Sequence, residues 1–304
     1  MKKLILTLLF IFSTLNANDV EVFTSDNSDG VITTKTIEKA FKDAGFFISS
    51  NRDMNTPFNK QFKNSDYTIY NLFTFYKKDV VLKLVKKYPN IGLFAPMSMS
   101  IYTKKGEKTI SISSLTNEAM AKIIGAKKDD KDLKALRELV VATLKKAMPN
   151  GKFISPKYTI AKPIGELVTK FTMEIDAKDY DDELDDFKMG FEGELAPKGF
   201  VIAGQNNLGD DFDDVDFDGF DFYEVYSICK LPVIYTIAKT HPEAGAFAPC
   251  SLYISKKKGE AKLTVSFPSV YNWISSMGLE DKNDISVLKT AQKDMIGILK
   301  GLVE

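Results

Sequence analysis

The chain contains the same domain pattern twice. Residues 88–113 align with residues 241–266 at a constant offset of 153 positions, and twelve of the twenty-six aligned residues are identical. Average composition would give about two identities by chance. The shared residues include a Gly-x-Phe-Ala-Pro step and a Lys-Lys-Gly-Glu step. Self-similarity at a fixed spacing is typical of duplicated structural units, so both halves are expected to form the same fold.

The ends of the two copies match as well. Their apolar positions recur at an offset of 155, and these are Leu133, Leu136, Val140, Leu144 and Ala147 against Leu288, Ala291, Met295, Leu299 and Leu302. Pro149-Asn150-Gly151, which lies between the copies, is typical of a turn. We therefore predict two homologous domains, residues 18–150 and 151–304, after an N-terminal segment of residues 1–17.

The hydrophobic pattern of the first copy alternates between strand and helix periods. Alternating or continuously apolar runs predict strands at residues 20–24, 46–50, 67–76, 97–103 and 108–114. Apolar residues three and four positions apart predict helices near residues 37–44, 80–88, 117–124 and 131–147. The order β-α-β-β-α-β-β-α-α is an α+β pattern, with a small, mostly antiparallel sheet and helices packed on one face. Over residues 158–198 the alignment of the second copy with the first is ambiguous.

The N-terminal segment has the composition of a signal peptide. Met1-Lys2-Lys3 precedes an apolar run over residues 4–12, and small and polar residues lead to Ala17. This order predicts a cleaved signal peptide at residues 1–17 and export to a bacterial periplasm. The alternative is an uncleaved N-terminal anchor. No later segment has eighteen uninterrupted apolar residues, so we expect a soluble mature chain without a membrane span.

The charges balance over the whole chain but not within each copy. The sequence has 41 basic and 41 acidic side chains, which is unlike a uniformly basic nucleic-acid binder. Residues 18–150 carry a net charge of +7 and residues 151–304 a net charge of −9. Opposite fields orient two surfaces toward each other, so we expect the two domains to dock as a pseudo-dimer. The alternative is unselected drift on two solvated surfaces.

Several short sequence motifs of the two copies resemble those of a known family. Each copy has Gly-Phe after its first helix, an aromatic strand and a Gly-x-Phe-Ala-Pro entry into a hairpin, and the second copy adds Cys229-Lys230-Leu231-Pro232 and Pro249-Cys250. The chain resembles the domain-of-unknown-function family 302 over nearly all of residues 18–304. Members often show Cys-Asn-Pro after the strand and Leu-Pro-Cys before the hairpin. The first copy departs from this pattern, with Tyr76 and Met97 at the two cysteine positions. The resemblance implies a compact α+β domain and no particular activity.

Cys229 and Cys250 are the only cysteines, and three interpretations are open for them. A disulfide is permitted in an exported protein but requires Cα atoms within about 7 Å. Buried free thiols are the common state of isolated cysteines on strands. A redox pair, or a thiolate-bound metal with His241 as a further ligand, is the third interpretation. His241 also fits a plain structural role, because it lies near a helix C-terminus ahead of Pro242.

An acidic loop resembles the opening of a calcium site. Asp214, Asp216 and Asp218 precede Gly219 in a D-x-D-x-D-G pattern. The twelfth position of a standard EF-hand would be Glu, but it is Val225 here. The pattern therefore predicts at most weak calcium binding. The alternative is a solvated acidic loop with Phe side chains packed beneath it.

The shared Phe-Ala-Pro steps predict either packing or a ligand groove. Phe94 and Pro96 of the first copy match Phe247 and Pro249 of the second. Paired apolar residues usually belong to the core. In the alternative, all four residues line a groove that binds a small molecule.

No catalytic constellation is recognisable in the sequence, so an enzyme is the less favoured class. The first hypothesis is an exported, non-enzymatic protein that binds a small ligand or a periplasmic protein, with one copy supporting and the other binding. The second is a redox or metal-handling protein that uses the two cysteines of the second copy. The sequence assigns no cofactor beyond weak calcium or a thiolate-bound metal.

Overall fold

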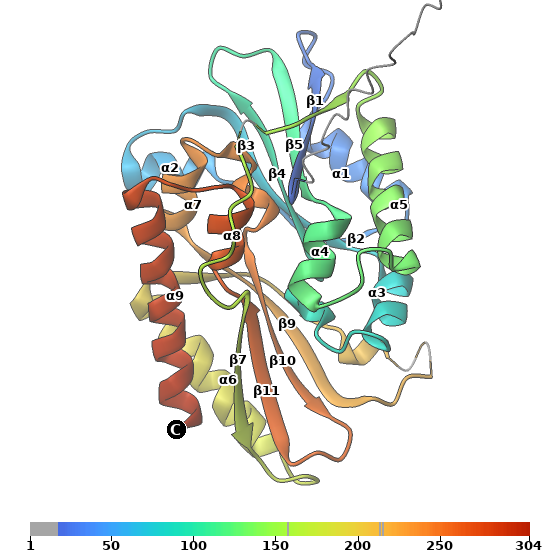
Figure 1. Cartoon of the computed structure of the whole chain (residues 1–304), viewed down its shortest axis with the longest axis vertical. Coiled ribbons are helices and arrows are strands. Elements are labelled where there is room, and N and C mark those ends of the chain that lie inside the picture. Colours follow the sequence, from blue (N-terminus) through green and yellow to red (C-terminus); the bar gives the residue numbers. More distant parts are fainter. Residues whose placement is uncertain (1–17, 157, 213, 215) are drawn as a thin grey trace, which may run out of the picture.

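The chain forms two antiparallel sheets, each with its own helices. The computed structural model describes residues 18–304 apart from 157, 213 and 215, so the predicted signal peptide at residues 1–17 lies outside the described residues. The sheets have six and five strands and lie end to end in the view of Figure 1. This is the mixed α+β fold with two homologous domains that the sequence predicts.

The first domain contains every strand and helix expected from its apolar pattern, and further elements besides. Its strands are β1 (Val20–Asp26), β2 (Phe47–Asp53), β3 (Tyr67–Tyr76), β4 (Met97–Lys104), β5 (Thr109–Leu115) and β6 (Lys152–Ile154). Its helices are α1 (Thr34–Asp43), α2 (Asn55–Phe62), α3 (Lys78–Val85), α4 (Asn117–Ile124) and α5 (Lys131–Ala147), with a 3₁₀ turn, η1 (Ile91–Leu93). The strand order is β2-β3-β4-β5-β1-β6.

The second domain repeats this order. Its strands are β7 (Val168–Glu174), β8 (Phe200–Asn207), β9 (Phe220–Lys230), β10 (Cys250–Lys257) and β11 (Lys262–Pro268). Its helices are α6 (Asp181–Leu195), α7 (Leu231–Ala238), α8 (Tyr271–Ser276) and α9 (Lys282–Val303), and its 3₁₀ turns are η2 (Ala196–Lys198), η3 (Gly209–Asp211) and η5 (Pro242–Ala246). The strand order β8-β9-β10-β11-β7 matches β2-β3-β4-β5-β1, which settles the ambiguous stretch: β7 and α6 are the counterparts of β1 and α1.

Two elements of the first domain have no counterpart in the second. Helix α2 follows β2, and the second domain has the acidic loop of residues 208–219 at this place. Strand β6 lies beyond the predicted joint at Pro149-Asn150-Gly151, yet it pairs with β1 as the sixth strand of the first sheet. The predicted helix at residues 80–88 is also shorter than expected, because α3 ends at Val85 and a turn leads to Pro89.

The two domains pack through the inward faces of their sheets. Successive residues of a strand point to opposite faces, and the register places Tyr70, Leu72 and Ser100 together on the inward face of the first sheet. The hydroxyl groups of Tyr70 and Ser100 donate to the carbonyl of Pro242, at 3.1 and 2.8 Å. In the second domain the hydroxyl of Tyr223 donates to the carbonyl of Pro89 at 2.9 Å. The same bond is thus made in both directions, as in a two-fold symmetric dimer.

The hairpin entries form a second reciprocal pair. Ser98 donates to the carbonyl of Pro249 at 3.2 Å, and Ser251 donates to the carbonyl of Pro96 at 3.4 Å. Both Ala-Pro peptide bonds at these entries are cis. The contact of the domains therefore combines apolar packing with reciprocal hydroxyl-to-carbonyl bonds.

Ion pairs join the two domains at the exposed edge of their contact. The ammonium group of Lys78 lies 2.7 Å from carboxylate oxygens of both Asp211 and Asp214. Lys78 is about half exposed, so these ion pairs contribute little stability. The two oppositely charged domains thus form ion pairs at an exposed edge, and a buried carboxylate also joins them, since the Ser276 hydroxyl donates to Asp19 at 2.6 Å.

Among residues 18–304, with the three gaps named above, no helix combines the length and the apolar character needed to cross a bilayer.

Candidate functional site

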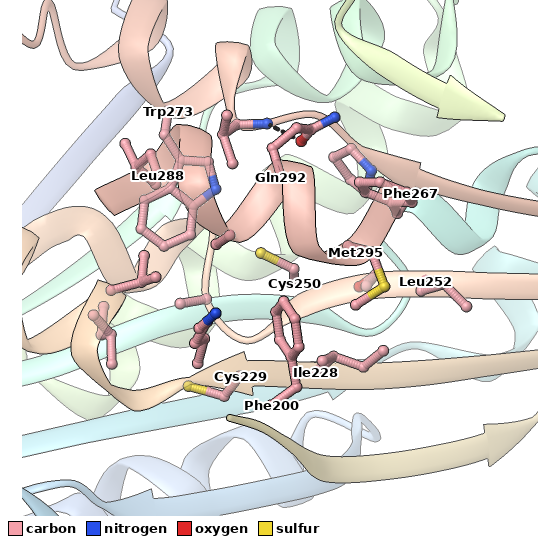
Figure 2. Close-up of a pocket in the computed structure, with 18 residues that line it drawn as sticks. Phe200, Ile228, Cys229, Cys250, Leu252, Phe267, Trp273, Leu288, Gln292 and Met295 are labelled. Carbon is pink, nitrogen blue, oxygen red and sulfur yellow. Dashed lines mark hydrogen bonds between the residues drawn. The ribbon is translucent and has the colours of Figure 1, made fainter. Parts of the chain in front are cut away.

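The second domain contains a cavity between its sheet and its last helix. The cavity has a volume of about 60 Å³ and lies under α9, against the helix-covered face of β9, β10 and β11 (Figure 2). We call it the Cys250 cavity, and its walls are mainly apolar: they include Phe200, Ile228, Val233, Ile234, Ala248, Cys250, Leu252, Phe267, Val270, Trp273, Leu288, Ala291 and Met295. Leu288, Ala291 and Met295 follow the i, i+3, i+7 spacing of one helix face, which is why α9 presents all three to the sheet.

Cys250 lies at the centre of this site. It opens strand β10, pairs with Ile228 in the sheet register and points toward Trp273 in Figure 2. Burial raises the pKa of the Cys250 thiol to about 12, although a hydrogen bond from the Trp273 side chain opposes the shift. At neutral pH the side chain is therefore a protonated thiol, which behaves as a small apolar group.

The polar groups around the Cys250 cavity are engaged with one another. The Gln292 amide accepts from the Val270 backbone at 3.1 Å and donates to the Thr169 hydroxyl at 2.7 Å. Lys230 pairs with Asp294 at 2.5 Å and lies 4.8 Å from the ring centroid of Phe200. The cavity is thus an apolar space closed by satisfied polar groups.

The first domain fills the corresponding space. Its equivalent hollow is lined by Met97, Ser98, Met99, Ser114, Leu115, Met120, Arg137 and Val140, and its volume is only about 10 Å³. Each of these residues aligns with a wall residue of the Cys250 cavity at the offset of 153 or 155. Met97 stands where the second domain has Cys250, and its longer side chain occupies the space that the thiol leaves free.

The four residues predicted to line a groove do come together. Phe94, Pro96, Phe247 and Pro249 line one pocket of about 30 Å³ between the domains, which we call the Phe/Pro pocket. The ring of Trp273 lies 5.7 Å from that of Phe247. Together with Cys250, Ser251 and Pro268, Trp273 also lines the Cys250 cavity. The two spaces therefore adjoin through a shared wall.

The two cysteines lie on opposite faces of the second sheet. Cys250 pairs with Ile228, so Cys229, one residue further along β9, belongs to the inward face. Both cysteines are free thiols, and Figure 2 shows them on neighbouring strands. Burial also raises the pKa of Cys229 to about 12. Both side chains are partly buried, and their placement on opposite faces of the sheet does not suit a disulfide.

His241 lies apart from the cysteines. Its Nδ1 is 2.9 Å from the Thr240 hydroxyl and its ring centroid is 5.6 Å from that of Tyr158. Burial lowers its pKa, which favours the neutral imidazole. In the part of the chain that the structure describes, no three His, Cys, Asp or Glu side chains are grouped for a metal ion. The structure therefore does not bring His241, Cys229 and Cys250 together as a ligand set.

The carboxylates of the acidic loop are directed to lysines rather than to one centre. Asp214 pairs with Lys78 at 2.7 Å, and Asp218 pairs with Lys258 at 2.9 Å. Asp216 takes a positive φ of 48° at the turn between them. Beneath the loop, Phe212 and Phe217 pack edge to face at 5.2 Å, as expected for the alternative of a loop supported by Phe side chains.

Two features of the site were not predicted from the sequence. The sequence did not identify Trp273 and Met295 as residues that line the cavity. They align with Met120 and Val140, which line the equivalent hollow of the first domain. The second feature is Glu243, a carboxylate buried at the domain contact, where burial raises its pKa and the Tyr158 side chain and the Lys104 charge oppose the shift. Its counterpart in the first copy is Asn90, so the alignment gave no sign of an acid.

Comparisons with known proteins relate both domains to one family. The crystal structure of an uncharacterized conserved DUF302 protein from Bacillus stearothermophilus is similar at 13% identity and a TM-score of 0.38, over 46% of this chain and 100% of that chain. No curated protein sequence matches the chain. The sequence profile of the family described as "Domain of unknown function DUF302" matches residues 23–150 and 176–302, one match in each domain. Since these matches span well over half of the sequence, the chain belongs to the DUF302 family, with two of its domains in tandem.

Proposed function

We propose that the second domain binds a small, uncharged, apolar ligand in the Cys250 cavity, and that the first domain supports it. The observation that carries this proposal is the difference between two copies of one fold. The same space has about 60 Å³ in the second domain and about 10 Å³ in the first. Folded proteins are close-packed, so a space kept open in one copy and filled in the other points to use rather than to poor packing.

The chemistry of the walls sets the class of ligand. Gln292 and Lys230 already have partners, so a ligand would find no free charge inside the cavity. Since a single water needs about 10–15 Å³ measured in this way, the cavity has room for roughly four or five non-hydrogen atoms. A larger ligand would extend into the adjoining Phe/Pro pocket. The proposed ligand is therefore a small hydrocarbon-like molecule or the apolar end of a longer one.

Binding is favoured over redox chemistry because of the state of the thiols. Nucleophilic and metal-binding cysteines act as thiolates, whereas burial raises the pKa of both Cys229 and Cys250 to about 12. Export to the periplasm and weak calcium binding remain predictions from the sequence alone. Cell fractionation tests the export, and the intact mass of the purified chain shows whether residues 1–17 have been removed.

The binding proposal is tested by equilibrating protein labelled with ¹³C at the methionine methyl groups with xenon at increasing pressure, because xenon is a small apolar atom that suits a cavity of about 60 Å³. The Met295 resonance is expected to shift in a saturable way, because this side chain lines the Cys250 cavity. The variant Cys250→Met places in the second domain the residue that fills the first, and it should abolish the shift. Met97→Cys is the matched control, which enlarges the other hollow and should leave the Met295 titration unchanged. An unchanged titration in Cys250→Met would refute the proposal.

A further inference from the structure

A larger space lies between the domains, on the opposite face of the second sheet. It has a volume of about 200 Å³ and is bordered by the edge strands β2 and β8, which contact each other, and by the start of α7. We call it the Arg52 cleft. Its apolar wall consists of Met54, Leu72, Val201, Leu231 and Pro249. It is distinct from the Cys250 cavity, with which it shares only Cys229.

Arg52 supplies a cation to this cleft. In the sheet register, Arg52 lies beside Leu72, and Leu72 lies beside Ser100, so all three side chains share one face. Ser100 bonds to the second domain, which shows that this face is the inward face of the first sheet. Within the described residues, its guanidinium has no ion pair or hydrogen bond. Its charge acts on Cys229 across the cleft, where it lowers the pKa of the thiol against the larger effect of burial.

The neighbouring carboxylate, that of Asp53, already accepts hydrogen bonds from helix α2. Asp53 also borders the cleft, but its carboxylate accepts bonds from the backbone of Asn55 at 3.0 Å and from the backbone and hydroxyl of Thr56 at 3.1 and 2.7 Å. These bonds close the first turn of α2 and direct the carboxylate to the backbone of the helix rather than to Arg52. Arg52 is thus the cation available to a ligand in the cleft.

The far wall of the cleft is an unusually exposed apolar surface. Val201 is 53% exposed although it lies directly opposite Cys229 in the sheet. On the other side, helix α2 closes the cleft by packing on α7, where Phe62 stacks on Tyr235 at 3.8 Å. The cleft therefore combines a charged rim with an apolar interior, a pairing that suits an amphipathic ligand.

The pseudo-symmetric position elsewhere in the molecule has different residues. Tyr76 takes the place of Cys229 there, and its ring is buried beside Phe47 at 5.1 Å. Asn206 takes the place of Arg52 and donates a hydrogen bond across the domain contact to Ser49 at 3.0 Å. Residue differences at both positions, together with the extra helix α2, thus distinguish the Arg52 cleft from its pseudo-symmetric counterpart.

We propose that the Arg52 cleft binds an amphipathic monocarboxylate, with its carboxylate on Arg52 and its alkyl chain against Val201, Leu231 and Pro249. Arginine binds carboxylates through paired N–H donors. An apolar cavity of about 150 Å³ holds benzene, so about 200 Å³ suits a slightly larger molecule such as a medium-chain fatty acid. This site does not depend on the function proposed for the Cys250 cavity.

The test uses octanoate and 1-octanol as probes on the full chain, with binding measured by calorimetry. Octanoate is expected to bind, and Arg52→Gln should weaken its binding at least tenfold while it changes the binding of 1-octanol less than twofold. The control Lys60→Gln removes an exposed cation of α2 that does not border the cleft, and it should leave octanoate binding unchanged. Cys229→Tyr, which introduces the residue found at position 76, should remove the binding of both probes.

A second measurement locates the ligand without any variant. Octanoate should slow the alkylation of Cys229 by iodoacetamide at pH 9, followed by mass spectrometry of the Cys229 peptide. The proposal is overturned if octanoate shows no saturable binding at millimolar concentration. It is also overturned if Arg52→Gln binds octanoate as well as the wild type, or if alkylation of Cys229 proceeds at the same rate with and without octanoate.

Discussion

Two residue positions distinguish the Arg52 cleft and the Cys250 cavity from the equivalent places elsewhere in the molecule. Where the first domain has Tyr76 and Met97, the second has Cys229 and Cys250, which are smaller side chains on opposite faces of one sheet. One change opens the Arg52 cleft and the other opens the Cys250 cavity. A duplicated domain can acquire such spaces in one copy because the other copy retains the filled core.

The thiols should react slowly, and their reactivity should rise steadily with pH. The thiolate is the reactive form, and burial raises the pKa of Cys229 and Cys250 to about 12. The alkylation rate of each native cysteine is therefore expected to increase about tenfold per pH unit from pH 7 to pH 10. Alkylation quenched at a series of times, followed by mass spectrometry of the two cysteine peptides, measures both rates. A plateau near pH 8–9 would show an ordinary thiol and contradict the prediction.

Glu243 should make the fold less stable as the pH rises. Its carboxyl is buried against tyrosines, and burial raises its pKa above the ordinary value of about 4.3. A raised pKa in the folded state means that the folded chain binds the proton more tightly than the unfolded chain. Its contribution to stability is therefore complete below pH 4 and declines as the pH rises through the folded pKa.

Replacement of this residue by its neutral isostere gives the test. Glu243→Gln should be more stable than the wild type at pH 7, and the difference should disappear toward pH 4. Urea denaturation at a series of pH values measures both. Glu260→Gln, at an exposed position, is the control that should show no such trend. Equal stability of Glu243→Gln and the wild type at every pH would contradict the prediction.

At the scale of elements, the sequence predicted those with strong periodic patterns. Helix α1 has Ile37, Ala40 and Phe41 on one face and is capped by Thr33, and helices α4 and α5 have the predicted bounds. Helix α2 was missed because its eight residues bury one apolar side chain, Phe58, so no period was visible. Strand β6 was missed because its three exposed residues are held by pairing with β1, a tertiary contact that no local pattern encodes.

The candidate site was predictable only in part, for a similar reason. The duplication singled out Phe94, Pro96, Phe247 and Pro249, and the structure brings all four to one pocket. The Cys250 cavity and the Arg52 cleft depend on side-chain volumes at positions far apart in the chain. A sequence pattern reports which residues are apolar, but it does not report whether neighbouring side chains fill the space between them.

Helix α9 forms the outer wall of the Cys250 cavity, and its start depends on one cap. Asp281 accepts hydrogen bonds from the backbone of Asn283 at 2.8 Å and of Asp284 at 3.0 Å. Asp281→Ala should destabilise the protein by about 1 kcal/mol, because two backbone donors lose their partner. Asp281→Ser can still cap the helix and should retain most of the stability. Chemical denaturation measures both variants, and equal losses for Ala and Ser would show that the cap is not the cause.

At the scale of the whole molecule, the two domains of one chain meet as the two subunits of a symmetric dimer would. The bonds from Tyr70 to Pro242 and from Tyr223 to Pro89 are equivalent under the duplication, as are those from Ser98 to Pro249 and from Ser251 to Pro96. Isologous contacts of this kind arise when the same surface patch meets itself. The tandem arrangement keeps both patches in one chain, which leaves each copy free to change elsewhere.

Close approach at two equivalent glycines makes this contact sensitive to a single methyl group. A Cβ atom at Gly245 would lie 2.4 Å from the Cβ of Ser100, and one at Gly92 would lie 2.7 Å from the Cβ of Tyr253. Both neighbours lie on central strands of the other domain, so they can move only if the domains separate. Gly245→Ala should therefore destabilise the protein by roughly 1–3 kcal/mol through overpacking.

The shape of the unfolding transition should distinguish separation of the domains in Gly245→Ala from damage within one domain. In the wild type the shared interface is expected to give a single unfolding transition by calorimetry, whereas Gly245→Ala should broaden or split it. Gly297→Ala, in helix α9, is the matched control: a Cβ there meets no atom within 4 Å, and alanine favours the helix by up to about 1 kcal/mol. A sharp single transition in Gly245→Ala at the wild-type temperature would mean that the domains do not depend on this contact.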